Sequence, residues 1–174
     1  MSNHLIFCVE SNKKAITDYI YIKHTIGHFY PFYNRADTKF SVVYMDGKGN
    51  YSKPKVARQI EKYANHYRVT NPDGRNIVIY CFDCDDYDIK HEDKAFLVEA
   101  HDYCNRNGYR FVWFCKEVES VYLGKRVSDN EKVKEANAFA RKKGIESIDG
   151  KKLRANAYRD TCSNICSVLD EYLL

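Results

Sequence analysis

The fold is decided by one stretch in the middle of the chain, Ile77-Val78-Ile79-Tyr80-Cys81-Phe82-Asp83-Cys84-Asp85-Asp86. Its continuous run of β-branched and aromatic residues is typical of a buried strand in a parallel sheet. The run ends in three carboxylates within four positions. Carboxylates this close repel one another, and a divalent cation such as Mg²⁺ removes that electrostatic cost. A solvated acidic turn before the next helix is the simpler alternative for such a motif.

Three more apolar runs alternate with amphipathic segments along the chain. With the central run, the predicted strands cover residues 5–9, 40–44, 76–82 and 110–114. The spacing of apolar residues between them predicts helices over residues 13–23, 53–67 and 92–106. Strands that alternate with helices form a parallel sheet covered on both faces. We therefore predict an α/β fold, a three-layer Rossmann-like sandwich whose four-stranded, mainly parallel sheet has the order 2-1-3-4.

The last third of the sequence is predicted to be helical. Helices are expected over residues 130–143 and 155–174, with a loop over 144–153. A chain of 174 residues is long enough for one domain with a well-formed core. We predict a catalytic core over residues 1–128 and a helical extension over 129–174 that packs on the same domain.

Composition limits the functional classes. The 28 basic and 24 acidic residues give a net charge of +4, which permits nucleic-acid binding without requiring it. No stretch of about 18 apolar residues predicts a membrane span, and no secretory signal opens the chain, so we expect a cytoplasmic protein with reduced thiols. Cys81 and Cys84 form a CxxC pair without a second pair at zinc-finger spacing, and its role stays open.

Acidic residues follow three of the four predicted strands. In an open α/β sheet, ligands bind beyond the carboxyl ends of the strands, where the crossovers diverge. If the first and third strands are neighbours, Glu10 faces Asp83 and Asp85 across that crevice. Such oxygen ligands suit one or two Mg²⁺ ions. The candidate ligands are Glu10, Asp83, Asp85, Asp86, Glu117 and Glu119.

Lysines surround the same edge of the predicted sheet. Charge runs are usually solvated faces, but these lie in sequence beside the acidic residues and could hold a phosphate backbone. The candidates for nucleic-acid binding are Lys13, Lys14, Lys48, Lys53 and Lys116. Gly47 and Gly49 would let the turn after the second strand approach a phosphate closely.

The ordered motifs over residues 5–125 resemble the toprim domain, found in topoisomerases, bacterial primases and the OLD-type and RloB-like nucleases. That family has a Glu after its first strand, a small polar turn after the second and DxD after the third. The matching segments here are Val9-Glu10-Ser11, residues 44–50 and Phe82-Asp83-Cys84-Asp85, and residues 117–123 resemble the acidic segment of the RloB-like subgroup. Ser11 stands where the family usually has Gly.

The resemblance implies a nuclease that depends on Mg²⁺ or Mn²⁺ and cleaves phosphodiesters of DNA, RNA or tRNA. It implies that Asp83 and Asp85 are the principal metal ligands and that Glu10 is a ligand or the general acid/base. It also implies a role in phage defence and an ATPase encoded nearby as a protein partner. A toprim-like module that binds nucleic acid or a partner without catalysis is the main alternative. A haloacid-dehalogenase-type phosphatase is disfavoured because its DxD follows the first strand.

Overall fold

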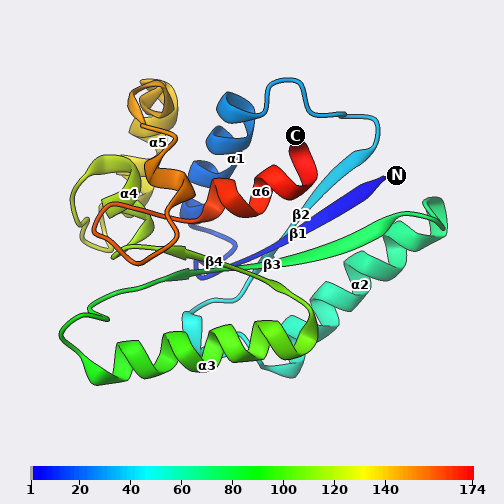
Figure 1. Cartoon of the computed structure of the whole chain (residues 1–174), viewed down its shortest axis with the longest axis horizontal. Coiled ribbons are helices and arrows are strands. Elements are labelled where there is room, and N and C mark those ends of the chain that lie inside the picture. Colours follow the sequence, from blue (N-terminus) through cyan, green and yellow to red (C-terminus); the bar gives the residue numbers. More distant parts are fainter. Residues whose placement is uncertain (1) are drawn as a thin grey trace.

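A computed structural model describes residues 2–174 and contains one four-stranded parallel sheet. Its strands are β1 (Asn3–Val9), β2 (Thr38–Tyr44), β3 (Arg75–Asp83) and β4 (Arg110–Phe114). They lie in the order β2-β1-β3-β4 (Figure 1). The predicted α/β class, the parallel sheet and its strand order are therefore confirmed. Because β1 and β3 are neighbours, the crossovers diverge between them, and ligands bind at such a point in open α/β sheets.

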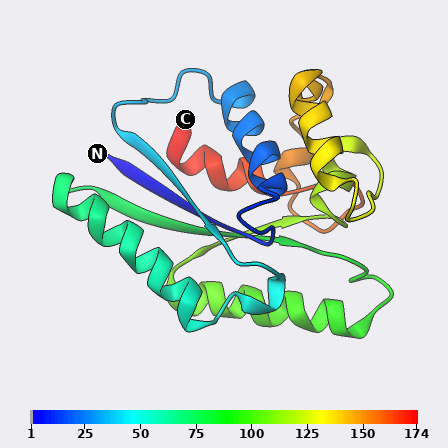
Figure 2. The same cartoon turned by 180° about the vertical axis from the view of Figure 1, so that it is seen from behind.

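Two layers of helices cover the sheet, as Figures 1 and 2 show from opposite sides. One face carries α2 (Pro54–Thr70) and α3 (His91–Asn107). The other carries α1 (Thr17–Phe29), α4 (Val118–Leu123), α5 (Lys132–Arg141) and α6 (Ile165–Leu173). Side chains along each strand alternate between two separate hydrophobic cores: Phe7 and Cys81 face the α1 side, whereas Cys8 and Phe82 face the α2 side.

Local sequence signals explain several helix boundaries. Pro54 occupies the first turn of α2, where its missing N–H has no intrahelical partner to lose. Gly108 ends α3 in the left-handed conformation with φ of 68°. Helix α1 starts four residues later than predicted, because the Asn12 side chain accepts hydrogen bonds from the N–H groups of Lys14 and Ala15 and holds this segment in a turn.

The C-terminal segment differs from the prediction in one respect. Residues 155–163 are not helical, and α6 begins only at Ile165. This segment instead covers the outer edge of β4: Ser163 forms an antiparallel bridge with Phe114, and Asn164 Oδ1 accepts a hydrogen bond from the Trp113 N–H at 2.9 Å. An uncovered strand edge would leave its backbone groups unpaired, and this pairing outweighs the helical pattern of the sequence. The loop expected over residues 144–153 contains two short 3₁₀ helices, Gly144–Ser147 and Lys152–Arg154.

Residues beyond 128 share the core of the sheet. Phe139 of α5 and Leu169 of α6 belong to the same hydrophobic cluster as Phe7 of β1. The Tyr30 hydroxyl, which follows α1, donates a hydrogen bond to Asp170 at 2.6 Å. The seven cysteines are free thiols, and no helix among residues 2–174 has the length and hydrophobicity needed to cross a membrane.

Candidate metal and nucleic-acid site

The ends of β1 and β3 are joined through their acidic residues. Glu10 Oε1 accepts a hydrogen bond from the Asp83 N–H at 2.8 Å. Asp83 Oδ1 in turn accepts one from the N–H of Val118, the first residue of α4, at 2.9 Å. The two acids therefore lie side by side at the carboxyl edge of adjacent strands, and backbone donors hold both of them in place.

Two further acids approach this pair from the helices on the same face. Asp18, in the first turn of α1, accepts a hydrogen bond from the Ser11 N–H at 2.9 Å. Glu119 of α4 is 0% exposed, and neither of its carboxylate oxygens has a hydrogen-bond partner among the described residues. We refer to Glu10, Asp18, Asp83 and Glu119 as the inner carboxylates.

The charge of the inner carboxylates is poorly offset by the protein. Within residues 2–174, the only cation at salt-bridge distance from any of them is Lys132 of α5, whose Nζ lies 3.8 Å from Glu119 Oε2. Burial alone would lower the pKa of Lys132, but the charges of Glu119 and Asp83 outweigh it and raise the pKa. Among the described residues, Lys132 is thus the only cation at salt-bridge distance from the inner carboxylates.

Burial raises the pKa of every inner carboxylate, and repulsion from neighbouring acids adds to the effect for Glu10, Asp83 and Glu119. Loss of hydration is the largest cause in each case. The pKa of Glu10 rises to about 8, with the charges of Asp18 and Asp85 adding to the effect. The pKa of Glu119 rises to about 7. The charges of Glu10, Asp18 and Glu119 all raise the pKa of Asp83, which shows that the four groups interact.

The other predicted ligands form a different set, which we call the outer carboxylates: Asp85, Asp86 and Glu117. Asp85 forms an ion pair with Lys48, which also lies 3.2 Å from Asp93. Its backbone is in the left-handed region, with φ of 48°, a conformation that Asp tolerates better than most residues.

Asp86 and Glu117 share a cation. Asp86 pairs with Lys90 at 2.8 Å and with Arg126, and these two charges lower its pKa. Arg126 Nε also lies 3.7 Å from Glu117 Oε1. The structure therefore brings Glu10, Asp83 and Glu119 together, whereas Asp85 and Asp86 are matched by cations of the chain. Glu117 shares Arg126 with Asp86, and its Oε2 has no hydrogen-bond partner among the described residues.

The inner carboxylates have the right kind of ligand atoms for a hard divalent cation, but their side chains are not arranged around a common centre. Oxygen donors with excess negative charge, including the two unpartnered oxygens of Glu119, are the ligands that Mg²⁺ and Mn²⁺ prefer. Among the residues described, however, no group of three or more His, Cys, Asp or Glu side chains is arranged to hold a metal ion. Binding would require these side chains to rotate toward a common centre.

The predicted lysines fall into two groups. Lys13, Lys14 and Lys53 line a groove of about 720 Å³ beside β2 and the start of α2, together with Lys55. All four are exposed, and the ion pairs within residues 2–174 use other cations. Lys48 and Lys116 are instead paired with acids, Lys48 with Asp85 and Lys116 with Asp88 at 3.1 Å.

The turn after β2 connects this groove to the inner carboxylates. Gly47 has φ of 110°, which only glycine adopts readily, and its N–H donates to the Glu10 carbonyl at 2.9 Å. That N–H is thus used within the protein rather than directed at a phosphate. This hydrogen bond holds the turn after β2 beside Glu10.

Sequence reasoning did not find Asp18 or Lys132. Asp18 was expected in the middle of a helix, whereas α1 begins at Thr17 and puts it in the first turn, beside the end of β1. The Asn12 turn was the signal that could have located it. Lys132 carries no such signal, because only the packing of α5 against α1 and α4 brings it to Glu119.

The chain has no significant match among protein-family models, curated proteins or solved structures. Its function must therefore be argued from the site itself.

Proposed function

We propose that this protein is a toprim-like nuclease, a phosphodiester hydrolase that uses Mg²⁺ or Mn²⁺ and acts on nucleic acid in the cytoplasm. The observation that carries the proposal is the set of inner carboxylates at the switch point of the sheet, of which only Glu119 has a cation at salt-bridge distance among the described residues. Keeping unpaired carboxylates partly buried is costly, and a site that binds a cation offsets that cost. The motif order seen in the sequence supports the same class.

The residues of the site would divide the work as follows. Glu10, Asp83 and Glu119 would hold the cation, and when bound it would polarise the phosphodiester and lower the pKa of a water molecule. The Asp83 N–H orients the Glu10 carboxylate. Burial raises the pKa of Glu10 to about 8 in the metal-free protein, so Glu10 would be either a ligand whose proton the cation displaces or a general acid/base beside a cation held by Asp83 and Glu119.

The lysine groove supports a nucleic-acid substrate. Lys13, Lys14, Lys53 and Lys55 are exposed, lack acidic partners among the described residues and line one groove next to the turn after β2. Phosphate contacts of this kind release counterions, so binding should weaken with salt. In the Lys13→Glu/Lys14→Glu double variant, the slope of log affinity against log salt should fall by about 1–2. Because Lys134 is exposed on α5 and outside the groove, Lys134→Glu is the matched control. An unchanged slope in the double variant would exclude the groove.

The deciding experiment is a cleavage assay with and without Mg²⁺ or Mn²⁺ on single- and double-stranded DNA, RNA and tRNA. Glu10→Gln keeps the volume of the side chain but removes its charge. We expect it to reduce cleavage by about a hundredfold or more while affinity stays within about twofold. Glu146→Gln, at an exposed acid away from the site, is the control.

One observation favours the alternative of a non-catalytic binding module: Asp85, a principal ligand in the resemblance, is occupied by Lys48, and no preformed metal site exists among the described residues. If the wild-type protein binds nucleic acid, cleaves none of the substrates with either metal and is unaffected by Glu10→Gln, this alternative replaces the nuclease. A role in phage defence and an ATPase partner remain part of the proposal through the toprim resemblance alone.

A further inference from the structure

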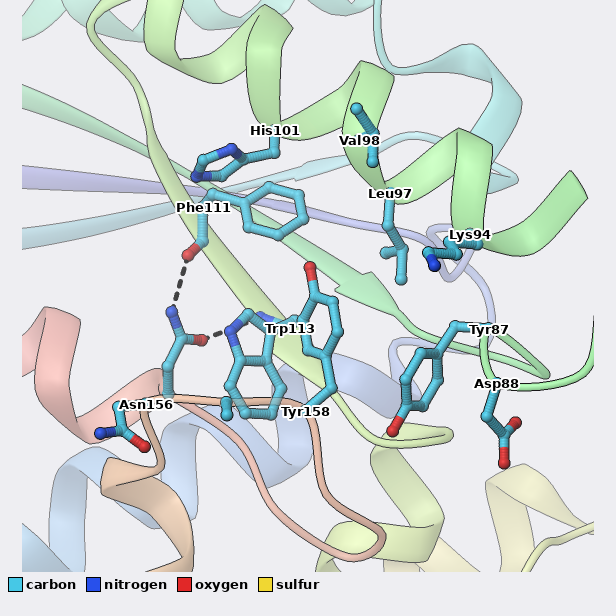
Figure 3. A pocket seen from close by; sticks show the side chains of 12 residues that line it. Tyr87, Asp88, Lys94, Leu97, Val98, His101, Phe111, Trp113, Asn156 and Tyr158 are labelled. Carbon is cyan, nitrogen blue, oxygen red and sulfur yellow. Dashed lines mark hydrogen bonds between the residues drawn. The ribbon is translucent and has the colours of Figure 1, made fainter. Parts of the chain in front are cut away.

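A second cavity lies on the opposite side of the sheet from the inner carboxylates. It has a volume of about 630 Å³ and lies between α3 and β4, with the segment Asn156–Tyr158 as its other wall (Figure 3). Its size is within the range of pockets that bind small molecules, about 300–1,000 Å³. None of its residues belongs to the inner or outer carboxylates, and Asp88 forms an ion pair with one candidate residue of that site, Lys116.

Aromatic side chains from three parts of the chain form the cavity. Trp113 and Tyr158 meet edge to face, with ring centroids 4.9 Å apart and planes at 88°. Tyr87 packs on Tyr158 at 5.2 Å and 66°. Trp113 is 6% exposed, whereas Tyr87 and Tyr158 are half-buried, so the ring surface open to a planar guest belongs to the two tyrosines. Figure 3 shows the three rings side by side, facing Leu97 of α3.

Hydrogen-bond donors and acceptors surround this aromatic centre. Asp88 offers acceptors, Lys94 offers a donor, and His101 and Asn156 can offer either; all four are exposed. A pocket for an aliphatic chain does not need donors and acceptors at its mouth. A pocket for a nucleobase needs them, because the flat faces of the base are apolar while its rim carries donors and acceptors in one plane.

The cavity is linked to the carboxylate edge through one loop. Tyr87 and Asp88 follow directly after Asp85 and Asp86, and Asp88 pairs at 3.1 Å with Lys116, which follows β4. The loop that carries the outer carboxylates Asp85 and Asp86 thus continues into the wall of the cavity.

We propose that this cavity binds one unpaired nucleobase of a single-stranded nucleic acid. The inference rests on the proposed function and adds the substrate class: single strands, or duplexes from which one nucleotide is turned out. Tyr87 and Tyr158 would supply the stacking surface, with Trp113 packed against Tyr158, and Lys94 and Asn156 would contact the rim of the base.

Trp113 gives a direct readout, because it is the only tryptophan of the chain. Without metal, we would follow its fluorescence while adding short oligothymidylate, oligouridylate or an abasic strand of equal length. Base-bearing strands should change the emission and bind at least about tenfold more tightly than the abasic strand, since stacking contributes about 1–3 kcal/mol per base. The thymidylate and uridylate arms distinguish DNA from RNA.

Variants separate stacking from other effects. Tyr158→Ala should remove the preference for base-bearing strands, whereas Tyr158→Phe should keep it, because the ring remains. Phe32→Ala is the control, since Phe32 is 96% exposed and lies outside the cavity. Circular dichroism would establish that each variant is folded.

Equal affinity for base-bearing and abasic strands, or an unchanged preference in Tyr158→Ala, would overturn the inference. Failure of the nuclease proposal looks different: base-dependent binding would persist, but no strand would be cleaved with Mg²⁺ or Mn²⁺. No binding of any strand would overturn both.

Discussion

The inner and outer carboxylates share one edge of the sheet but are stabilised in different ways. Backbone N–H groups of Ser11, Asp83 and Val118 hold Asp18, Glu10 and Asp83, which fixes their positions without neutralising their charge. Lysine and arginine side chains hold Asp85 and Asp86 of the outer set and neutralise them. The pKa is accordingly raised for Glu10 by burial and lowered for Asp86 by Lys90 and Arg126. The difference indicates which acids have charge left for an external cation.

The largest expected effect concerns Glu119 in metal-free protein. Its pKa is about 7 when folded against an ordinary value of 4.5, so the folded state binds the proton more tightly. The stability that the protonated Glu119 carboxyl contributes is fully present below pH 4.5 and is lost as the pH rises through 7. Glu119→Gln removes the ionisable group and should be more stable than wild type at pH 8, by on the order of 3 kcal/mol.

Urea denaturation at pH 5 and pH 8 in the presence of a chelator measures this difference. The gain in Glu119→Gln should fall to about a quarter at pH 5, where the folded wild-type carboxyl is protonated but the unfolded one is still largely ionised. Asp86 should act with the opposite sign, because its lowered pKa contributes stability that is lost as the pH falls through the acidic range. A gain in Glu119→Gln that is independent of pH would show that its charge is not the cause.

The second effect is metal-linked stability. A cation that binds the folded state at about a hundred times its Kd contributes about 2.7 kcal/mol, which raises Tm by roughly 5–10 °C for a chain of this size. We expect Mn²⁺ to raise Tm in wild type and in Asp86→Asn, an outer variant. The rise should be absent in Asp83→Asn, since that change removes an inner ligand.

Differential scanning fluorimetry of each protein with and without Mn²⁺ provides the comparison, because each variant serves as its own reference. If Asp86→Asn loses the rise and Asp83→Asn keeps it, the outer acids are the ligands and the present assignment is reversed.

The third prediction concerns the stability lost when Lys132, the cation next to Glu119, is replaced. Lys132→Met leaves Glu119 without a neighbouring positive charge and should cost about 2 kcal/mol at pH 8, less than the roughly 3–5 kcal/mol for a fully buried ion pair because the Lys132 side chain is 27% exposed. At pH 5 the loss should be smaller, since Glu119 is then neutral. Lys134→Met, at an exposed position two residues further along α5, is the matched control. Equal losses at both pH values would assign Lys132 a packing role only.

At the carboxyl edge of the sheet, the sequence could predict only those residue positions that follow from the order of the strands. Apolar runs located all four strands, and parallel neighbours necessarily bring the residues after β1 and β3 together, so the proximity of Glu10 and Asp83 followed. Asp18 did not follow, because its position depends on one side-chain turn at Asn12 that delays α1. The pairing of Asp85 with Lys48 depends on side-chain conformation, which spacing does not encode.

The C-terminal wall of the second cavity was missed for a similar reason. Apolar spacing predicted a helix from residue 155, but Asn164 uses both ends of its amide on β4, accepting from Trp113 N–H and donating to the Phe111 carbonyl. These bonds tie the segment to the strand edge. Tyr158 reaches the cavity only through this tertiary contact, which a local pattern does not contain.

The smallest expected effect is in the outer set. Asp86 and Arg126 form an ion pair in which the arginine side chain is 48% exposed, so water and salt screen their attraction. A double-mutant cycle with Asp86→Asn and Arg126→Gln should give a coupling energy below about 1 kcal/mol. The same cycle with Glu119→Gln and Lys132→Met should give a larger value at pH 8, because Glu119 is fully buried. Urea denaturation of the single and double variants measures both. Equal couplings would mean that burial does not distinguish the two sets, and the raised pKa of the inner carboxylates would no longer identify them as the cation site.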